Sequence, residues 1–172
     1  MPKLSAWILI LFLAASSCAI AAEQIYQEPD LFVAQALGSR LQSRVLWLTR
    51  NMQAEVEKIL GHPPPQLRQR YWSDGARSVW VLEEIGKEEP ITAGFVVAND
   101  RIDHVRVLVY RESRGSEVRY PAFLKQFAGA TLAADHRLSQ IVDGISGATL
   151  SVSALERLAR VALYFDRLSR LP

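Results

Sequence analysis

The chain has 172 residues, of which 49% are hydrophobic and 22% are charged. This composition is typical of one folded domain with an ordinary core, and it excludes an intrinsically disordered chain. The 20 basic residues nearly balance the 18 acidic ones, for a formal net charge of +2. A general nucleic-acid binder, which carries a large positive charge, is therefore not expected.

Residues 1–22 differ in kind from the rest of the chain. Lys3 precedes the apolar run AWILILFLAA, and the small residues SSCAIAA follow it. This order is typical of a secretory signal peptide, with cleavage expected after Ala21 or Ala22. The apolar run is short for a membrane span, which makes an uncleaved anchor the weaker interpretation. We therefore expect an exported protein, periplasmic or attached to the outer face of the inner membrane.

The single cysteine, Cys18, lies inside this predicted signal peptide. Its neighbours form only a weak lipoprotein-processing site, with alanine where leucine is more usual, so lipidation of Cys18 is the less favoured alternative. If cleavage follows Ala22, the mature chain has no cysteine. It then needs no disulfide in an oxidising compartment and has no thiol chemistry.

The first part of the mature chain, residues 23–66, is predicted to be a mixed helical and extended segment. A short helix is expected after Pro29, where an acidic residue opens an apolar stretch. Residues 44–48, RVLWL, form a candidate strand.

A second predicted helix covers residues 50–60. Thr49 precedes it as a capping residue, its apolar residues recur on one face, and Gly61 is its stop signal. Residues 62–65, HPPP, forbid a helix because proline lacks the N–H donor, so we expect an extended connector.

Residues 67–172 are predicted to form the functional domain. Asp74-Gly75 and Asn99-Asp100 are hairpin turn signals between runs rich in β-branched and aromatic residues. A helix is expected near residues 121–129, and a final amphipathic helix over about residues 151–169. The pattern predicts an α+β fold: a small antiparallel sheet packed with helices, the last of which follows a loop rich in glycine and hydroxyl residues.

Side chains should alternate between the two faces of the strand that follows Asn99-Asp100. Strict alternation predicts that Val105, Val107 and Val109 share one face of the sheet. The opposite face would then carry Arg106, Leu108 and Tyr110.

Residues 143–151, DGISGATLS, place an acid, two glycines and several hydroxyls directly before the final helix. Asp, Ser and Thr accept hydrogen bonds from helix N–H groups, so the stretch fits a helix cap. It also fits a phosphate-binding turn, because the N–H groups at a helix start attract anions. The Gly-Lys-Ser/Thr ending of a P-loop is absent. The residues alone leave the cap and the anion site open.

The stretch Asp143-Gly144-Ile145-Ser146-Gly147-Ala148-Thr149 resembles the flavinylation motif D-x-x-[ST]-G-A-[ST] of the FMN-binding domain family. This family includes the C subunit of the sodium-translocating NADH:quinone reductase, the G subunit of the Rnf complex, and small exported single-domain members. All the specified positions match, and the similarity extends upstream through VRVLVYRES, RGSEVRYP and AFLKQFAG.

In that family, the threonine at the position of Thr149 carries FMN through a phosphoester. A flavin transferase moves the FMN part of FAD onto the hydroxyl and releases AMP. The resemblance therefore implies covalent FMN on Thr149 and a flavin transferase as a maturation partner.

The other motif residues are expected to form the cofactor site: Asp143, Gly144, Ser146, Gly147, Ala148, Leu150 and Ser151. Asp143 would hold the loop or assist the transferase, and Ser146 would hydrogen-bond within the loop. Gly144 would permit an unusual turn. Gly147 and Ala148 would keep bulk away from the approaching transferase.

Several residues upstream of the motif are also candidates to contact the cofactor. Arg111, Arg114 and Arg119 could meet the FMN phosphate or stabilise a reduced flavin, although surface ion pairs explain such arginines equally well. Tyr110 and Tyr120 could pack against the isoalloxazine ring, although tyrosines in strands commonly pack on the sheet itself.

The resemblance implies an electron carrier that relays electrons between a membrane redox protein and an extracytoplasmic acceptor. No nicotinamide or substrate domain is evident, so a carrier is favoured over a stand-alone oxidoreductase. Two alternatives stay open: an FMN-dependent reductase with non-covalent FMN, and an exported structural or interaction module in which SGAT is only a cap. The scattered His62, His104 and His136 predict no metal site.

Overall fold

The computed structural model describes residues 23–171, so the predicted signal peptide and Cys18 lie outside the described residues. The strands are β1 (Gln24–Ile25), β2 (Gln42–Trp47), β3 (Arg68–Ser73), β4 (Arg77–Ile85), β5 (Pro90–Ala98) and β6 (Arg101–Tyr110). The helices are α1 (Pro29–Leu37), α2 (Arg50–Leu60), α3 (Pro121–Leu124) and α4 (Thr149–Ser169). Short 3₁₀ turns cover Gly38–Arg40, Ser116–Arg119 and Lys125–Phe127.

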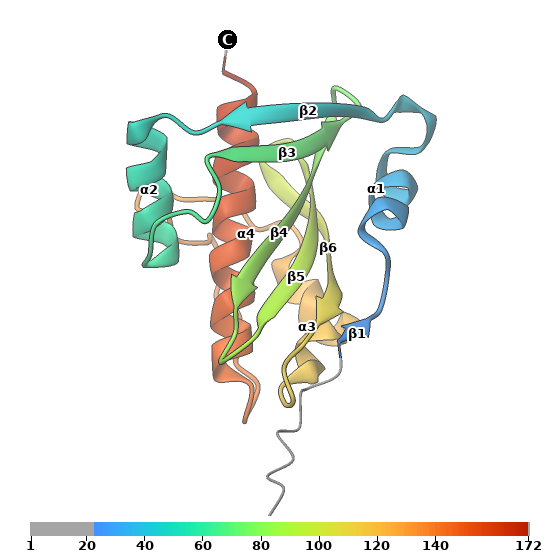
Figure 1. The fold of residues 1–172 in the computed structure, drawn as a ribbon, viewed down its shortest axis with the longest axis vertical. Helices are drawn as coiled ribbons and strands as arrows, with labels where there is room; N and C mark the ends of the chain where they lie inside the picture. The colour runs from blue at the N-terminus through green and yellow to red at the C-terminus, as the bar shows by residue number, and fades with distance from the viewer. Residues whose placement is uncertain (1–22, 172) are drawn as a thin grey trace, which may run out of the picture.

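The strands form one antiparallel sheet in the order β1-β6-β5-β4-β3-β2. Helix α4 crosses one face of this sheet with α2 beside it, and α1 lies on the opposite face (Figure 1). The predicted α+β fold class, with an antiparallel sheet and a C-terminal helix, is confirmed. Segment 23–66 contributes β1, α1, β2 and α2 to this same sheet and its two apolar layers.

Each face of the sheet has its own apolar cluster. The larger cluster lies under α4, where the fully buried Trp80, Phe95 and Leu155 pack together. The smaller one lies under α1, where Phe32 and Val33 pack on the opposite face of the strands. Burial of apolar surface on both faces holds the two helices and the sheet in one fixed arrangement.

A β-bulge in β6 changes which side chains face α4. The pairing register between β5 and β6 shifts across Leu108. Val105, Val107 and Tyr110 therefore belong to the cluster under α4, whereas Leu108 and Val109 belong to the cluster under α1. The prediction that Val109 shares a face with Val105 and Val107 is wrong, because one extra residue in a strand reverses the alternation beyond it. The bulge turns Tyr110 toward the α4 side.

Helix α2 has the bounds that the sequence predicts. The Thr49 hydroxyl accepts a hydrogen bond from the Met52 N–H at 3.4 Å, and Gly61 ends the helix in a left-handed conformation with φ of 85°. The capping hydroxyl satisfies one of the helix's free N–H donors, and glycine adopts positive φ without steric cost.

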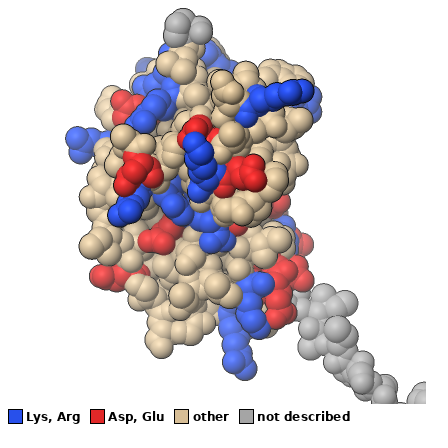
Figure 2. Space-filling model, turned by 90° about the vertical axis from the view of Figure 1, so that its left-hand side faces the viewer, with Lys and Arg blue, Asp and Glu red and all other residues tan. Residues whose placement is uncertain are grey.

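Two further features of the fold are the distribution of charge on the surface and the length and hydrophobicity of the helices. Basic and acidic side chains are interspersed over the face on the side of α2 (Figure 2). Within residues 23–171, none of the helices is both long enough and apolar enough to span a bilayer.

A buried polar network fixes the C-terminal half of α4 to β4. Asp166 is 1% exposed and accepts a hydrogen bond from the Ser78 hydroxyl at 2.5 Å. The guanidinium of Arg170 donates to the same carboxylate at 3.0 Å, and the Trp80 indole N–H donates to Ser78 at 2.7 Å. A buried carboxylate is tolerated here because each of its oxygens has a donor.

We expect Asp166→Ala to lower the free energy of unfolding by about 2–3 kcal/mol, because it leaves the buried Ser78 hydroxyl without its acceptor. Urea unfolding followed by circular dichroism measures this loss. Glu88→Ala is the control, since Glu88 and its partner Lys87 are both about 70% exposed and such pairs contribute about 0–1 kcal/mol. An equal loss in the two variants would contradict the structural role of Asp166.

Candidate functional site

The flavinylation-like motif forms the start of α4. Thr149 is the first residue of the helix and is exposed, and the buried Ala148 occupies the N-cap position without any side-chain cap. The first helical hydrogen bond runs from the Val152 N–H to the Ala148 carbonyl at 2.9 Å. The N–H groups of Thr149, Leu150 and Ser151 have no hydrogen-bond partner within residues 23–171. The interpretation of the motif as a simple side-chain cap therefore fails, and the helix start presents free donors.

A tight turn delivers the chain to this helix start. The Ala148 N–H donates to the Ile145 carbonyl at 3.0 Å, and Gly147, the third residue of the turn, has φ of 82°. Positive φ at this position is typical of a type II turn, which favours glycine. The prediction of an unusual turn at Gly144 is wrong, because Gly144 is not among the glycines with positive φ. Gly147 is therefore the glycine whose positive φ this turn requires.

The preceding loop is held by its backbone. The Asp143 N–H donates to the side-chain oxygen of Gln126 at 2.7 Å, and the Gln140 side-chain amide donates to the Gln126 carbonyl. The Asp143 carboxylate and the Ser146 hydroxyl are exposed, and neither has a hydrogen-bond partner in the described part of the chain. The Asp143 backbone therefore holds the loop, and its carboxylate stays accessible from solvent.

Tyr110 joins the end of β6 to the helix start. Its ring is 1% exposed, and its hydroxyl donates to the Arg114 carbonyl at 2.5 Å and lies 3.0 Å from the Ser151 hydroxyl. Burial raises the pKa of Tyr110, against the opposing effect of the Ser151 hydrogen bond, so the phenol stays protonated and remains a donor. Tyr110 is a structural link beneath the site and is not free to lie against a flavin ring.

Gly115 brings the loop of residues 111–119 into contact with the helix start. Its φ is 86°, and a Cβ built on it would lie 2.9 Å from the Tyr110 hydroxyl and 3.0 Å from the Ser151 hydroxyl. A third contact, to the Ala148 Cβ, would be 3.2 Å. Glycine is required here by both the backbone conformation and the lack of space.

Glu112 ties the same loop to the turn between β4 and β5. One oxygen of its carboxylate accepts hydrogen bonds from the N–H groups of Lys87, Glu88 and Glu89, the last two at 2.7 and 3.1 Å. Burial alone would raise the pKa of Glu112, but the three N–H donors and the nearby Lys87 outweigh it and lower the pKa below the usual range. The carboxylate therefore stays ionised and fixes the turn.

These three segments enclose a hollow of about 630 Å³ beside Thr149. Its walls are the turn at Lys87 and Glu88, loop residues 112–114, and the helix start from Gly147 to Ser151. The basic side chains in the wall are Lys87 and Arg114. The wall also contains the acids Glu88 and Glu112, so the positive end of the α4 dipole, and not the side-chain charge, favours an anion in this hollow.

The other candidate residues lie elsewhere. Arg111 pairs with Glu23 at 2.7 Å and donates to Thr92, on another part of the sheet. Arg119 stacks on Tyr26 and Tyr120, with its guanidinium carbon 4.6 and 4.8 Å from the ring centres. Of the three arginines considered from the sequence, the structure brings only Arg114 to the motif.

Lys87 and Glu112 lie in the wall of the hollow, although no sequence motif predicts a role for either. The two residues are 25 positions apart and meet because the β4–β5 turn lies against the loop after β6. No local motif signals this contact. The histidines lie apart: His62 is 3.2 Å from Glu84 and His136 is 3.7 Å from Glu55. Residues 23–171 contain no group of three His, Cys, Asp or Glu side chains placed to hold a metal.

Comparison with protein-family models matches residues 86–164 to the FMN-binding domain. The chain contains an FMN-binding domain. No match was found among proteins with curated descriptions. The matched segment includes the β4–β5 turn, the Gly115 loop and the start of α4, so it contains the whole wall of the hollow. The residues present fit FMN, because the free N–H donors at the start of α4 suit its phosphate.

Gly115→Ala tests the contact between the loop and the helix start of the FMN-binding domain. We expect it to cost about 1–3 kcal/mol more than Gly129→Ala, since both residues have positive φ but only Gly115 has close neighbours. Thermal unfolding of both variants gives the difference, and flavin absorbance per protein should fall only for Gly115→Ala. Equal stability and equal flavin content would contradict the tight contact at Gly115.

Glu112→Gln tests the charge that fixes the β4–β5 turn. Because the folded-state pKa of Glu112 is lowered, its ionisation stabilises the protein above the ordinary glutamate pKa of about 4.3. This stabilisation is lost as the pH falls through the folded-state pKa. Wild type should therefore be more stable than Glu112→Gln at neutral pH, and the two should converge in acid. Urea unfolding over a pH series measures this, with the exposed Glu117→Gln as control. Parallel curves for wild type and Glu112→Gln would contradict the assignment.

Proposed function

We propose that this FMN-binding protein is an exported electron carrier whose FMN is joined by a phosphoester to the side-chain oxygen of Thr149. The observation that carries the proposal is the placement of Thr149. Its hydroxyl is exposed at the first residue of a 21-residue helix, next to free N–H groups and a hollow of about 630 Å³.

The attachment reaction explains why exposure of Thr149 matters. In the proposed step, the Thr149 oxygen forms a bond to the phosphorus of the FMN half of FAD. The pyrophosphate bond on the far side of that phosphorus breaks, AMP leaves, and the hydroxyl proton is released. A separate flavin transferase must reach the hydroxyl for this step. The exposed Gly147 and Leu150 beside it leave the approach open.

The helix start supports retention of the phosphate. A phosphate on Thr149 would lie at the positive end of α4, where the N–H groups of Leu150 and Ser151 have no other partner in the described chain. The side-chain charges of the hollow balance, with Lys87 and Arg114 against Glu88 and Glu112, so these N–H groups supply the preference for a phosphate. The protein thus supplies position and electrostatics, and bound FMN supplies one- and two-electron chemistry.

Open access to the hollow favours an electron carrier over a stand-alone enzyme. Most of the wall residues are exposed, among them Arg114, Thr149 and Leu150, so a redox partner could approach the cofactor from solvent. The proposed partners are a membrane redox protein and an extracytoplasmic acceptor. Export is proposed from the signal-peptide pattern of residues 1–22, and a covalent tether keeps a cofactor that would be hard to replace outside the cytoplasm.

Thr149→Ala tests the attachment site. We expect wild type, produced together with a flavin transferase, to gain the mass of one FMN minus one water after denaturation, and Thr149→Ala to gain none. The fold should be unchanged because the side chain is exposed. Thr149→Ser should retain some attachment, since it keeps a hydroxyl.

Ser146→Ala is the matched control, because it removes an exposed hydroxyl three residues away and should leave the added mass in place. Covalent flavin on Thr149→Ala would refute the acceptor assignment. Flavin that is released from wild type on denaturation would instead indicate a reductase or carrier with non-covalent FMN.

A further inference from the structure

Strand β4 has an edge that no other strand covers along most of its length. It pairs with β5 from Arg77 to Ile85, but it pairs with β3 only at Ser78 and Val79. Beyond these two residues β3 runs away from β4, as Figure 1 shows. Residues 80–85 therefore face no strand on the β3 side within residues 23–171.

Pairing at the β4–β5 turn shows which backbone groups point to β5. The Gly86 N–H donates to the Glu89 carbonyl at 3.1 Å, so even-numbered residues of β4 direct their backbone groups to β5. Pro90, which has no N–H, lies opposite Ile85, where the antiparallel pattern needs none.

The odd-numbered residues consequently direct their N–H and C=O groups to the open edge. Two side chains already reach carbonyls there: Gln69 donates to Val81 at 3.4 Å, and Arg157 donates to Ile85 at 3.2 Å. The backbone N–H and C=O of Glu83, between them, have no hydrogen-bond partner in the described chain. These are groups that an added strand would bind.

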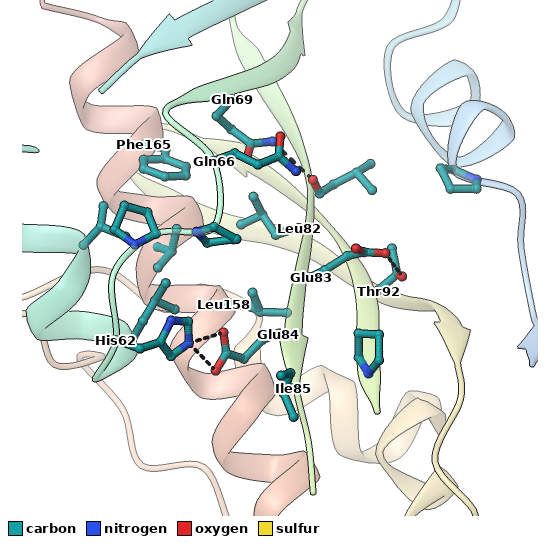
Figure 3. Close-up of a pocket in the computed structure, with 18 residues that line it drawn as sticks. His62, Gln66, Gln69, Leu82, Glu83, Glu84, Ile85, Thr92, Leu158 and Phe165 are labelled. Atoms are coloured by element: carbon teal, nitrogen blue, oxygen red, sulfur yellow. Dashed lines mark hydrogen bonds and ion pairs between the residues drawn. The ribbon is translucent and has the colours of Figure 1, made fainter. Parts of the chain in front are cut away.

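A hollow of about 440 Å³ follows this edge (Figure 3). On one side its wall contains Leu82, Leu158 and Phe165, in the layer between β4 and α4. On the other side it contains Val81 and Glu83, which point to the opposite face of the strand. A space that wraps around a strand edge suits an extended chain, whose alternate side chains lie on the two faces.

The buried carboxylate in the wall of this hollow is already paired. Glu84 is 6% exposed, and its carboxylate binds the Arg157 guanidinium at 2.9 Å and His62 at 3.2 Å. An apolar side chain placed near Leu82 would therefore meet no unpaired buried charge.

We propose that the open edge of β4 binds an extended segment of a partner protein, which adds a strand to the sheet. Its residues on the α4 side are apolar and pack against Leu82, Leu158 and Phe165. Its residue opposite Glu83 is basic. This inference does not depend on the attachment of FMN to Thr149.

Glu83 sets the preference for a basic partner over a second copy of this chain. Its side chain is 55% exposed, and its carboxylate accepts a hydrogen bond from Thr92 at 2.6 Å. Arg111 lies 3.7 Å away but is held more closely by Glu23, at 2.7 Å. Two copies paired antiparallel about the middle of this edge would place Glu83 opposite Glu83, and like charges directly opposite are destabilising.

The probe for this edge is a fluorescein-labelled peptide, Lys-Val-Lys-Val-Lys-Val-Lys, titrated with the purified full-length protein and followed by fluorescence anisotropy. In the proposed register its lysines lie opposite Val81, Glu83 and Ile85, and its valines face α4. Amide hydrogen exchange should show new protection at Val81 and Glu83 on binding, and no change at Leu82.

N-methylation of the peptide supplies a matched pair of controls. Methyl groups on the lysine amides, which point at β4, should weaken binding by at least about tenfold, because several hydrogen bonds are lost. Methyl groups on the valine amides, which point away, should leave binding unchanged. Equal effects of the two methylated peptides, or no binding of the parent peptide, would overturn the proposal.

Protein variants separate backbone pairing from charge. Glu83→Lys should weaken binding by roughly fivefold through like-charge repulsion. Glu57→Lys, the same charge change at an exposed residue of α2 outside the hollow, should not. An equal loss in both would show a non-specific charge effect and overturn the proposal. Thr149→Ala should bind the peptide like wild type, so failure of the flavin assignment and failure of this one are distinguishable.

Discussion

The buried hydroxyl of Tyr110 is the interaction on which the flavin site depends. It bonds the Arg114 carbonyl on one side and contacts the Ser151 hydroxyl on the other, and so joins the loop after β6 to the first turn of α4. Tyr110 reaches this position only because the bulge at Leu108 turns it to the α4 side of the sheet. Without the bulge, the ring would face α1, and the loop and helix start would lose their common anchor.

The charge that the hollow prefers in a ligand depends on which of its charged side chains are already paired. Its wall contains two acids, Glu88 and Glu112, and two bases, Lys87 and Arg114, so side-chain charge alone gives no net preference. Glu112 is occupied by the N–H groups of the β4–β5 turn, and Glu88 pairs with Lys87 in solvent. The free N–H groups at the start of α4 therefore determine which ligand charge the hollow prefers, and they favour an anion.

The sequence correctly predicted the helix ends and turns that depend on residues close together in the chain. Thr49 and Gly61 bound α2 as expected, both hairpins form at their predicted turns, and the motif lies at the start of the last helix. The bulge at Leu108 was missed, because residues 107–110, VLVY, form a continuous apolar run in which no break of alternation can be seen. The contact of Glu112 with the β4–β5 turn was also missed, since it joins residues far apart in the chain and depends on the folded sheet.

The turn between β4 and β5 lies between the two proposed surfaces of the protein. Its residues Lys87 and Glu88 line the flavin hollow, and the open edge of β4 ends at Ile85, immediately before it. Along α4, Ser151 in one hollow and Leu158 in the other are seven positions apart, a rise of about 10 Å. Glu112 bonds the turn to the loop that contacts the helix start, so a strand docked on β4 would lie at a fixed distance from the flavin. In the proposed carrier, this arrangement would hold a docked partner in one position relative to the cofactor.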